Sequence, residues 1–563
     1  MATLKGMAQY MATHHLEVER KYELADLTSP AVEIDWNQLE NLTVVETVQE
    51  HLEATYFDTP CNQLGKNMIA LRRRLGGYDQ GWHIKFDDRA GARHEMHFDL
   101  LADESKMPAA VNRFLQSAVG FEELGEKVSL ITDRTRTVLA DSSGVRVAEI
   151  CRDSVAARDF STDIERTWNE WEVELLEAGE VTGEEIFEAC EKIFSANGIV
   201  PSQSSAKIAR ALGQDAEFEA RRTGADKKYA VSRVSAGEKK KKSKKRASQR
   251  RQAAAASSID LLNTALDALL SDLLSWELKF RAGVPDSVHG LRQTIRKVES
   301  LLRFAARPFP RTEQAAQQMD AALEGLRGIY RSLAPARDVD IVRAFLAEVG
   351  TEPGAVTATA RQELEEMLAD DAEKNSREVL KVLDSDGFAM MRSDVAALQD
   401  NLAHEVELPL NCENFVNKVA KRIRKSLVAF NKDELKQLWK SDPTEFAYDM
   451  LNNDPLFRVR RAAQIGRYCM EALTATGIEL TDDQQQLAHL CTDLHRELSV
   501  LSDEQVTLTW LQSAARRAVR RGQDRLAIGY LMGRSSYYAV GLRLTDHSYV
   551  PSQLKALKKL DLK

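Results

Sequence analysis

The chain of 563 residues has few cysteines and no long apolar run. Its six cysteines lie far apart and none belongs to a Cys-x-x-Cys pair, which argues against a zinc ribbon and against a disulfide framework. No stretch approaches the roughly 18 consecutive apolar residues of a transmembrane helix. The first 15 residues also lack the continuous apolar core of a secretory signal. We therefore expect a cytoplasmic protein with reduced thiols and no membrane partner.

Charge is distributed unevenly along the chain. The formal net charge is −9, yet residues 1–220 carry 22 Lys and Arg against 40 Asp and Glu, whereas residues 221–563 carry 55 against 46. Most of the positive excess belongs to residues 221–251, with 14 basic and 2 acidic side chains. This contrast predicts two regions of different kind with a basic segment between them.

The hydrophobic pattern also changes along the chain. Residues up to about 180 alternate with period two in short runs, which predicts strands, and helical spacing follows at 183–198 and 204–212. The segment 236–258 is too polar to bury a core. From about 259 to 550 apolar residues recur at i, i+3, i+4 and i+7, which predicts helices throughout. We expect an α+β protein with a strand-rich domain (1–215), a basic flexible linker (216–252) and an all-α helical bundle (253–555).

The first predicted strand carries a row of charges. In HHLEVERKYEL, residues 14–24, Glu17, Glu19 and Lys21 share one face. Glu17 and Glu19 would lie about 6.8 Å apart, so their repulsion would be about 2.4 kcal/mol at an effective dielectric near 20. Either water screens these carboxylates or a cation lies between them.

Further charged rows follow on later strands. Glu170, Glu172 and Glu174 share one face of WNEWEVELL, and the strands between the two acidic rows carry basic ones. An ordinary sheet with one solvated face would explain any single row. Five rows, mostly of uniform sign, favour an interior in which carboxylates hold Mg²⁺ or Mn²⁺ and basic groups bind a polyanion. The basic candidates are Arg72, Arg74, Lys85, Arg134, Arg136 and, in the last short helix, Lys207.

The ordered set of motifs resembles the CYTH family, the triphosphate tunnel metalloenzymes. The motifs are E-x-E-x-K from Glu17, YFDT (56–59), LRxR (71–74), Lys85, R-x-E from Arg93, R-x-R from Arg134 and E-x-E from Glu172. The resemblance covers about 200 residues and implies an eight-stranded antiparallel tunnel barrel with flanking helices and inward-facing charges. One position departs from the pattern, because His97 stands where many members carry a second carboxylate. We expect His83 and His97 to be structural or wall residues rather than metal ligands.

The resemblance also implies roles for the charged residues. Metal ligands would be Glu17, Glu19, Glu172 and Glu174. The residues that bind triphosphate would be Lys21, Arg72, Arg74, Lys85, Arg134, Arg136 and Lys207. The catalytic residues would be Glu17, Glu19, Lys21 and Lys85.

A basic stripe marks the helical half. His289, Arg292, Arg296 and Arg303 share one helix face, which is either solvated or part of an anion groove between helices. H-x-x-R-x-x-x-R from His289 and RDVD (337–340) resemble the CHAD domain, which implies binding of inorganic polyphosphate by His289, Arg292, Arg296 and Arg337. The second repeat departs from the pattern at Phe457, Gln464, Ser502 and Asp503, and other charge is available from Arg516, Arg517, Arg520, Arg521 and Arg525.

These features predict a metal-dependent inorganic triphosphatase that hydrolyses tripolyphosphate to pyrophosphate and phosphate, with a helical polyphosphate-binding accessory domain. Two alternatives stay open: a tunnel enzyme acting on ATP or thiamine triphosphate, and a non-catalytic polyphosphate-docking protein. Nucleic acid is a less favoured partner, because no stacking platform or recognition motif accompanies the basic segment.

Overall fold

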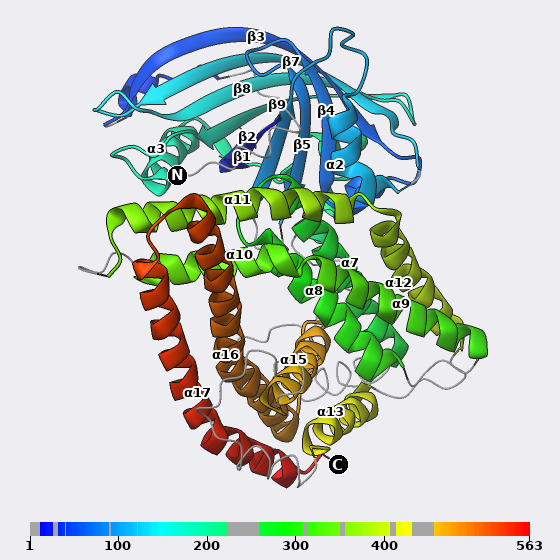
Figure 1. Ribbon diagram of the computed structural model, residues 1–563. Helices are drawn as coiled ribbons and strands as arrows, with labels where there is room; N and C mark the ends of the chain where they lie inside the picture. Colours follow the sequence, from blue (N-terminus) through cyan, green and yellow to red (C-terminus); the bar gives the residue numbers. More distant parts are fainter. Residues whose placement is uncertain are drawn as a thin grey trace, which may run out of the picture. The chain divides into compact units, whose positions relative to one another are not determined.

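A computed structural model (Figure 1) describes residues 12–25, 32–39, 41–88, 92–120, 122–222, 258–307, 312–349, 355–405, 412–430 and 455–562. The chain divides into two compact units. The sheet unit contains residues 7–228 with 281–283, and the helical unit contains residues 229–280 and 284–563 with 1–6. Where the chain is described, no helix is both long and apolar enough to cross a membrane.

The sheet unit is built on one antiparallel sheet in the order β1-β6-β5-β4-β3-β7-β8-β9-β2-β10. The long strands β3, β7 and β8 are strongly curved (Figure 1). The strands are β1 (Ala12–Glu17), β2 (Glu19–Leu24), β3 (Thr43–Asp58), β4 (Ile69–Leu75), β5 (Gly81–Asp87), β6 (Arg93–Phe98), β7 (Gly125–Ala140), β8 (Arg146–Asp159), β9 (Ile164–Leu175) and β10 (Ile199–Pro201).

The strands do not pair into the closed eight-stranded barrel that the resemblance implies. They form one sheet of ten strands in linear order. The predicted N-terminal strand is divided at Val18, because β1 pairs with β6 whereas β2 pairs with β9. The carbonyl of Val18 accepts a hydrogen bond from the amide of Leu175 at 2.9 Å, so the chain has changed partner at this residue. The three-residue strand β10 adds a further strand beside β2.

Helices cover apolar faces of this sheet. A capping box between Thr182 and Glu185 begins α3 (Gly183–Ala196), whose Phe194 packs with Tyr22 at a ring separation of 4.7 Å. Phe114 of α2 (Ala109–Val119) lies 6.1 Å from Phe86 between ring centres. The shorter helices are α1 (Gln63–Lys66), α4 (Lys207–Leu212), α5 (Asp215–Arg222) and the 3₁₀ turn η2 (Trp36–Gln38). The alternation of apolar and charged residues thus leaves the opposite strand face to the charges.

The predicted basic linker begins within α5. From residue 223 onward it lies outside the described residues.

The helical unit has no strand among its described residues. Its α16 and α17 lie side by side (Figure 1). At Gly290 of α8, a Cβ would lie 2.1 Å from the Trp276 ring of α7, so only glycine allows this approach. The helices are α7 (Ser258–Arg281), α8 (Ser287–Leu301) with its π turn η3 (Leu302–Ala306), α9 (Glu313–Ser332), α10 (Ala334–Val349), α11 (Ala358–Leu383), α12 (Asp386–Glu405), α13 (Cys412–Val428), α15 (Pro455–Thr474), α16 (Asp482–Arg521) and α17 (Leu526–Lys559).

Candidate active site and anion-binding clusters

The strand register brings the predicted charged residues of the sheet unit onto one face. Glu19 and Lys21 on β2 lie opposite Glu174 and Glu172 on β9. Arg134 on β7 lies opposite Asp153 on β8. Charged members of this face are buried rather than solvated: Glu17, Arg72, Arg134 and Glu172 are each less than 10% exposed, with 6, 8, 8 and 9%. The face is therefore not the solvated side of an ordinary sheet.

Lys207 is held by three buried carboxylates. Its ammonium, at the start of α4, lies 2.9 Å from Asp153, 2.7 Å from Glu170 and 2.7 Å from Glu172. Arg134 donates two hydrogen bonds of 2.7 Å to Asp153 and one of 2.9 Å to Glu172. Burial alone would lower the pKa of Lys207, but the three carboxylates outweigh it and hold that pKa well above its usual range.

These three carboxylates also form the acidic group that is geometrically closest to a metal site. Within the described ranges, Asp153, Glu170 and Glu172 are the group of three potential ligands whose donor atoms all lie within 4.8 Å of one another. Lys207 and Arg134 neutralise them in this structure. The sequence reasoning missed Asp153, although the alternation of Glu149, Cys151 and Asp153 along β8 could have indicated it.

A second carboxylate group lies nearer the break between β1 and β2. Lys85 donates to Glu17 at 2.5 Å, and Arg93 donates to Glu19 at 2.8 Å. The other oxygen of Glu17, Oε2, is buried without a hydrogen-bond partner. Lys21 contacts both Glu19 and Glu172, so it links this group to the Lys207 cluster.

Glu174 adds a buried carboxyl group with a raised pKa to this second group. The pKa of Glu174 is raised to about 8, chiefly by burial; the charge of Lys85 lowers this pKa, and the charges of Glu17 and Glu19 raise it. An orphaned carboxylate oxygen beside a carboxyl group that favours its neutral form is the environment that a divalent cation with oxygen ligands would stabilise. Glu17, Glu19 and Glu174 therefore have the chemistry to hold such an ion, whereas among the described residues the donor atoms that already lie within 4.8 Å of one another are those of Asp153, Glu170 and Glu172.

The remaining predicted cations already have acidic or phenolic partners. Arg72 lies 3.5 Å from Glu95, and Arg74 contacts Asp79. Although burial raises the pKa of Tyr56, the cations of Arg72, Lys207 and Arg74 together outweigh burial and the pKa is lowered. Pairing of this kind is what allows guanidinium groups to remain inside a protein.

Arg136 and the two predicted wall histidines also have partners on neighbouring strands and loops. Arg136 donates to Glu46 at 2.8 Å. His83 contacts Glu95 through Nδ1 at 2.8 Å, and His97 contacts the carbonyl oxygen of Gln80 through Nε2 at 3.1 Å. Both histidines thus interact with neighbouring strand and loop groups.

In the helical unit, two of the predicted arginines meet at one tyrosine. The guanidinium carbons of Arg292 and Arg296 lie 3.9 and 3.7 Å from the ring centre of Tyr330 on α9. Burial raises the pKa of Tyr330, but these cations outweigh it and lower that pKa. Arg337 on α10 lies 3.9 Å from Asp340. Burial, then the nearby charge of Arg337, lowers the pKa of His289, so all four predicted residues belong to one neighbourhood.

Residues of α15 and α16 extend this neighbourhood. Arg467 lies 3.2 Å from Nδ1 of His495, whose Nε2 is buried without a hydrogen-bond partner. Burial, with Arg460 and Arg467, lowers the pKa of His495 to about 3, so the ring is neutral. Arg460 donates to Ser499 at 3.2 Å. The sequence showed the Arg460 and Arg467 stripe, but nothing in it indicated His495 or Tyr330.

Two of the arginines near the end of α16 are paired. Arg517 contacts Asp371 at 2.9 Å and Arg521 contacts Asp370 at 3.4 Å.

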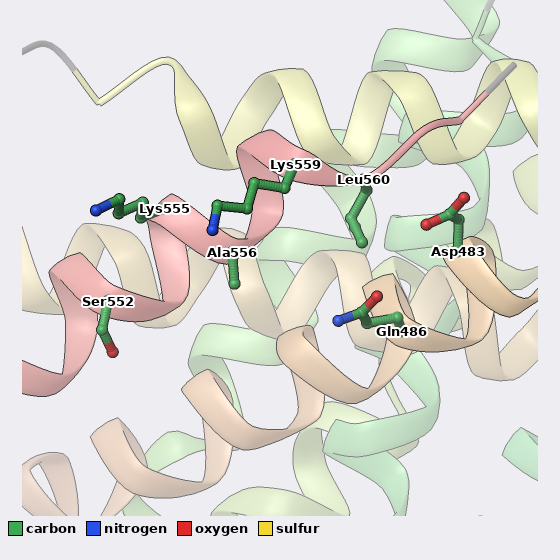
Figure 2. A pocket seen from close by; sticks show the side chains of 7 residues that line it. All are labelled: Asp483, Gln486, Ser552, Lys555, Ala556, Lys559 and Leu560. Carbon is green, nitrogen blue, oxygen red and sulfur yellow. The ribbon is translucent and has the colours of Figure 1, made fainter.

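A cavity of about 400 Å³ lies elsewhere in this unit, between α16 and α17 (Figure 2). Its lining contains no predicted site residue and consists of Asp483, Gln486, Ser552, Lys555, Ala556, Lys559 and Leu560.

Fold and site thus define a two-part protein, in which a sheet with a buried charged face precedes an all-helical unit with a cationic cluster. The chain contains a CYTH domain over residues 15–211 followed by a CHAD domain over residues 264–512.

Two relatives align with this chain over nearly its whole length. Two uncharacterized proteins of Mycobacterium tuberculosis, from strains CDC 1551 / Oshkosh and ATCC 25618 / H37Rv, are each 26% identical over 561 residues, covering 97% of this chain and 96% of the relative.

Solved structures resemble parts of the chain. The CHAD domain from the plant Ricinus communis is 19% identical and covers 54% of this chain and 93% of its own, with a TM-score of 0.41. A putative adenylate cyclase from Bacillus halodurans is 19% identical and covers 35% and 97%, with a TM-score of 0.24. A putative adenylyl cyclase from Hippeastrum, described as revealing a dominant triphosphatase activity, is 17% identical and covers 35% and 95%, with a TM-score of 0.23.

Proposed function

We propose that the chain is a metal-dependent inorganic triphosphatase that hydrolyses tripolyphosphate to pyrophosphate and phosphate. The CYTH domain narrows the class to triphosphatases and cyclases that act on triphosphates. The observation that carries the proposal is the charged face itself, where cations and carboxylates are buried together and paired. Phosphoryl transfer depends on positioning and charge neutralisation, which such a face supplies.

Mg²⁺ or Mn²⁺ would be held by Glu17, Glu19 and Glu174, with Glu172 as a fourth ligand. The orphaned Oε2 of Glu17 and the raised pKa of Glu174 support this assignment. When bound, the ion would polarise phosphoryl oxygens and lower the pKa of a water molecule. Glu172 contributes only if it exchanges some of its contacts with Lys21, Lys207 and Arg134.

The triphosphate would bind by taking the place of carboxylates as partner of the cations. Lys85, Arg72 and Arg74 reach the same face from adjacent strands, and each now contacts an acidic side chain. Phosphate oxygens offer the same charge-assisted hydrogen bonds, so the cations remain satisfied after the exchange. Lys21, Arg134, Arg136 and Lys207 complete the set.

The test is phosphate release by the full chain with Mg²⁺ or Mn²⁺, comparing tripolyphosphate, ATP, thiamine triphosphate and long-chain polyphosphate. We expect tripolyphosphate to be preferred and EDTA to abolish release. Glu17→Gln and Arg72→Met should each lower kcat by about 100-fold or more, because each removes a group that acts on the developing charge. Glu165→Gln, at an exposed position of β9, is the control. Undiminished release by Glu17→Gln would contradict the assignment.

The helical unit is the proposed binding site for inorganic polyphosphate. Arg292 and Arg296 at Tyr330, with Arg460 and Arg467, supply cations from α8 and α15. Arg296→Met and Arg460→Met should each weaken polyphosphate binding roughly tenfold, with affinity falling steeply as salt rises. Arg377→Met, whose side chain is 57% exposed on α11, should leave affinity unchanged. Tight polyphosphate binding without any metal-dependent release would favour the docking protein over the enzyme.

A further inference from the structure

Two histidines on the other face of the sheet are in direct contact. His14 on β1 is three residues from Glu17, and His94 on β6 is next to Glu95, so both histidines lie on the strand face opposite the charged one. Nε2 of His14 lies 3.0 Å from Nδ1 of His94, and the ring centres are 5.2 Å apart. Two imidazole nitrogens therefore meet at a place that the proposed reaction does not use.

His94 is held in a fixed orientation. It is 2% exposed, and its ring stacks on Phe86 of β5 with ring centres 5.0 Å apart and an interplanar angle of 13°. Its other nitrogen, Nε2, lies 3.7 Å from Oδ2 of Asp88. Oδ1 of Asp88 accepts a 2.9 Å hydrogen bond from the amide of Ala92, which fixes the carboxylate beside the ring. A carboxylate at Nε2 favours a proton on that nitrogen and leaves the lone pair on Nδ1, which faces His14.

The spacing of the two facing nitrogens suits a metal ion. Imidazole nitrogens bind Zn²⁺ at about 2.0–2.1 Å, so two such ligands are about 2.9 Å apart at a right angle and about 3.4 Å apart at a tetrahedral angle. The observed 3.0 Å lies within this range. Burial, with the charges of His94 and His15, lowers the pKa of His14 to about 4, so the His14 ring is neutral at neutral pH. A neutral imidazole with its proton on Nδ1 offers the Nε2 lone pair to a metal.

We propose that His14 and His94 bind a divalent transition-metal ion that prefers nitrogen ligands, such as Ni²⁺ or Zn²⁺, and that Asp88 orients His94 for this role. The described residues contain no group of three potential ligands that includes this pair, so water would fill the remaining positions. Imidazole suits Zn²⁺ and Ni²⁺, whereas carboxylate and water oxygens suit Mg²⁺ and Mn²⁺. The site therefore takes a different class of ion from the charged face, and it does not depend on the proposed triphosphatase.

The role of Asp88 follows from the chemistry of histidine ligands. A histidine that binds a metal usually donates its other N–H to a carboxylate, a carbonyl oxygen or water, which fixes the ring and raises the basicity of the ligating nitrogen. Loss of such a partner typically lowers metal affinity by about 10- to 100-fold. A histidine pair that serves only as a hydrogen bond within the sheet predicts no effect of Asp88 on metal affinity.

The test is isothermal titration calorimetry of the full chain with Ni²⁺ in excess Mg²⁺, which competes for the carboxylates of the charged face. His14→Gln and His94→Phe each remove one ligating nitrogen, and both should lose the Ni²⁺ site that wild type shows. Asp88→Asn should raise the Kd for Ni²⁺ by about 10- to 100-fold. The matched control is His51→Gln, which removes a histidine that contacts Asp133 at 2.7 Å, and it should keep the wild-type Kd.

Thermal unfolding gives a second readout. Ni²⁺ should raise the Tm of the sheet unit in wild type and in His51→Gln but not in His14→Gln, because an ion that binds only the folded chain stabilises it. A wild-type chain that binds no Ni²⁺ in excess Mg²⁺ overturns the site, and so does an unchanged Kd in His14→Gln. A loss of affinity that His51→Gln reproduces also overturns it. If His94→Phe fails to fold, His14→Gln, at a half-buried position, decides the question.

Discussion

Replacing Lys207 by methionine tests whether the charged face works as one buried network. The side chain of Lys207 is 9% exposed and its ammonium contacts Asp153, Glu170 and Glu172 at 2.7–2.9 Å. Methionine keeps the approximate volume but removes the charge, so three buried carboxylates lose a shared cation. Removing one partner of a buried ion pair typically costs about 3–5 kcal/mol.

For a unit of this size, that loss corresponds to a fall in Tm of about 6–20 °C without metal. The raised pKa of Lys207 means that its charge, and the stability that depends on it, persist below and through neutral pH and are lost only at strongly alkaline pH. A divalent cation reaches these carboxylates in wild type only by displacing the Lys207 ammonium and by exchanging contacts of Arg134 and Lys21. In Lys207→Met the ammonium no longer competes for the three carboxylates, so Mn²⁺ at about 100 times its Kd should restore about 2.7 kcal/mol.

The assay is differential scanning calorimetry of the full chain in EDTA and in a Mn²⁺ series, following the transition of the sheet unit. Lys192→Met, at an exposed position of α3, is the matched control and should leave Tm unchanged. The reasoning fails if Lys207→Met unfolds at the wild-type temperature in EDTA. It also fails if Mn²⁺ stabilises wild type and variant equally, because the ammonium would then not compete for these carboxylates.

Two further outcomes follow from the structure. Because the pKa of Glu174 is raised from 4.5 to about 8, the metal-free sheet unit should be most stable below pH 4.5 as far as this group is concerned and lose stability as pH rises through 8. Denaturant titrations from pH 4.5 to 8 should show that the free energy of unfolding falls with pH in wild type but not in Glu174→Gln. An equal fall in both proteins would mean that another group causes the pH dependence. In the helical unit, Gly290→Ala should destabilise by about 1–3 kcal/mol, since its methyl group overlaps Trp276. Gly533→Ala places its methyl group in open space and should stabilise the protein by up to about 1 kcal/mol. A Tm of Gly290→Ala at or above that of Gly533→Ala in thermal unfolding would contradict the described packing of Gly290 against Trp276.

Local patterns predicted most of the elements and part of the site. Period-two rows such as Glu170, Glu172 and Glu174 identified strands because a strand places alternate residues on one face. The same rule gave the charged face, since rows on separate strands can meet only in a shared sheet. Gly198 follows the turn at the end of α3, and Gly213 directly follows α4. Both glycines have a positive φ, which is common at the C-terminal ends of helices.

Pairings between distant segments could not be read from those patterns. The break at Val18 arises because β1 and β2 hydrogen-bond to different strands, and nothing local at that residue signals the change. His495 and Tyr330 likewise belong to the cationic cluster only because α9 and α16 lie close to α8 and α15.

The sequence by itself determined the two-part organisation, the alternating charged rows and the helical stripe of cations, because each depends on a period of two or 3.6 residues along one element. Only the tertiary structure decided which charges neutralise one another. Lys207 is bound by Asp153, Glu170 and Glu172, whereas Glu17 keeps an unpaired oxygen, and this difference follows from strand register and from where α4 begins. Electrostatic energy depends on distance and burial, and both are properties of the folded chain.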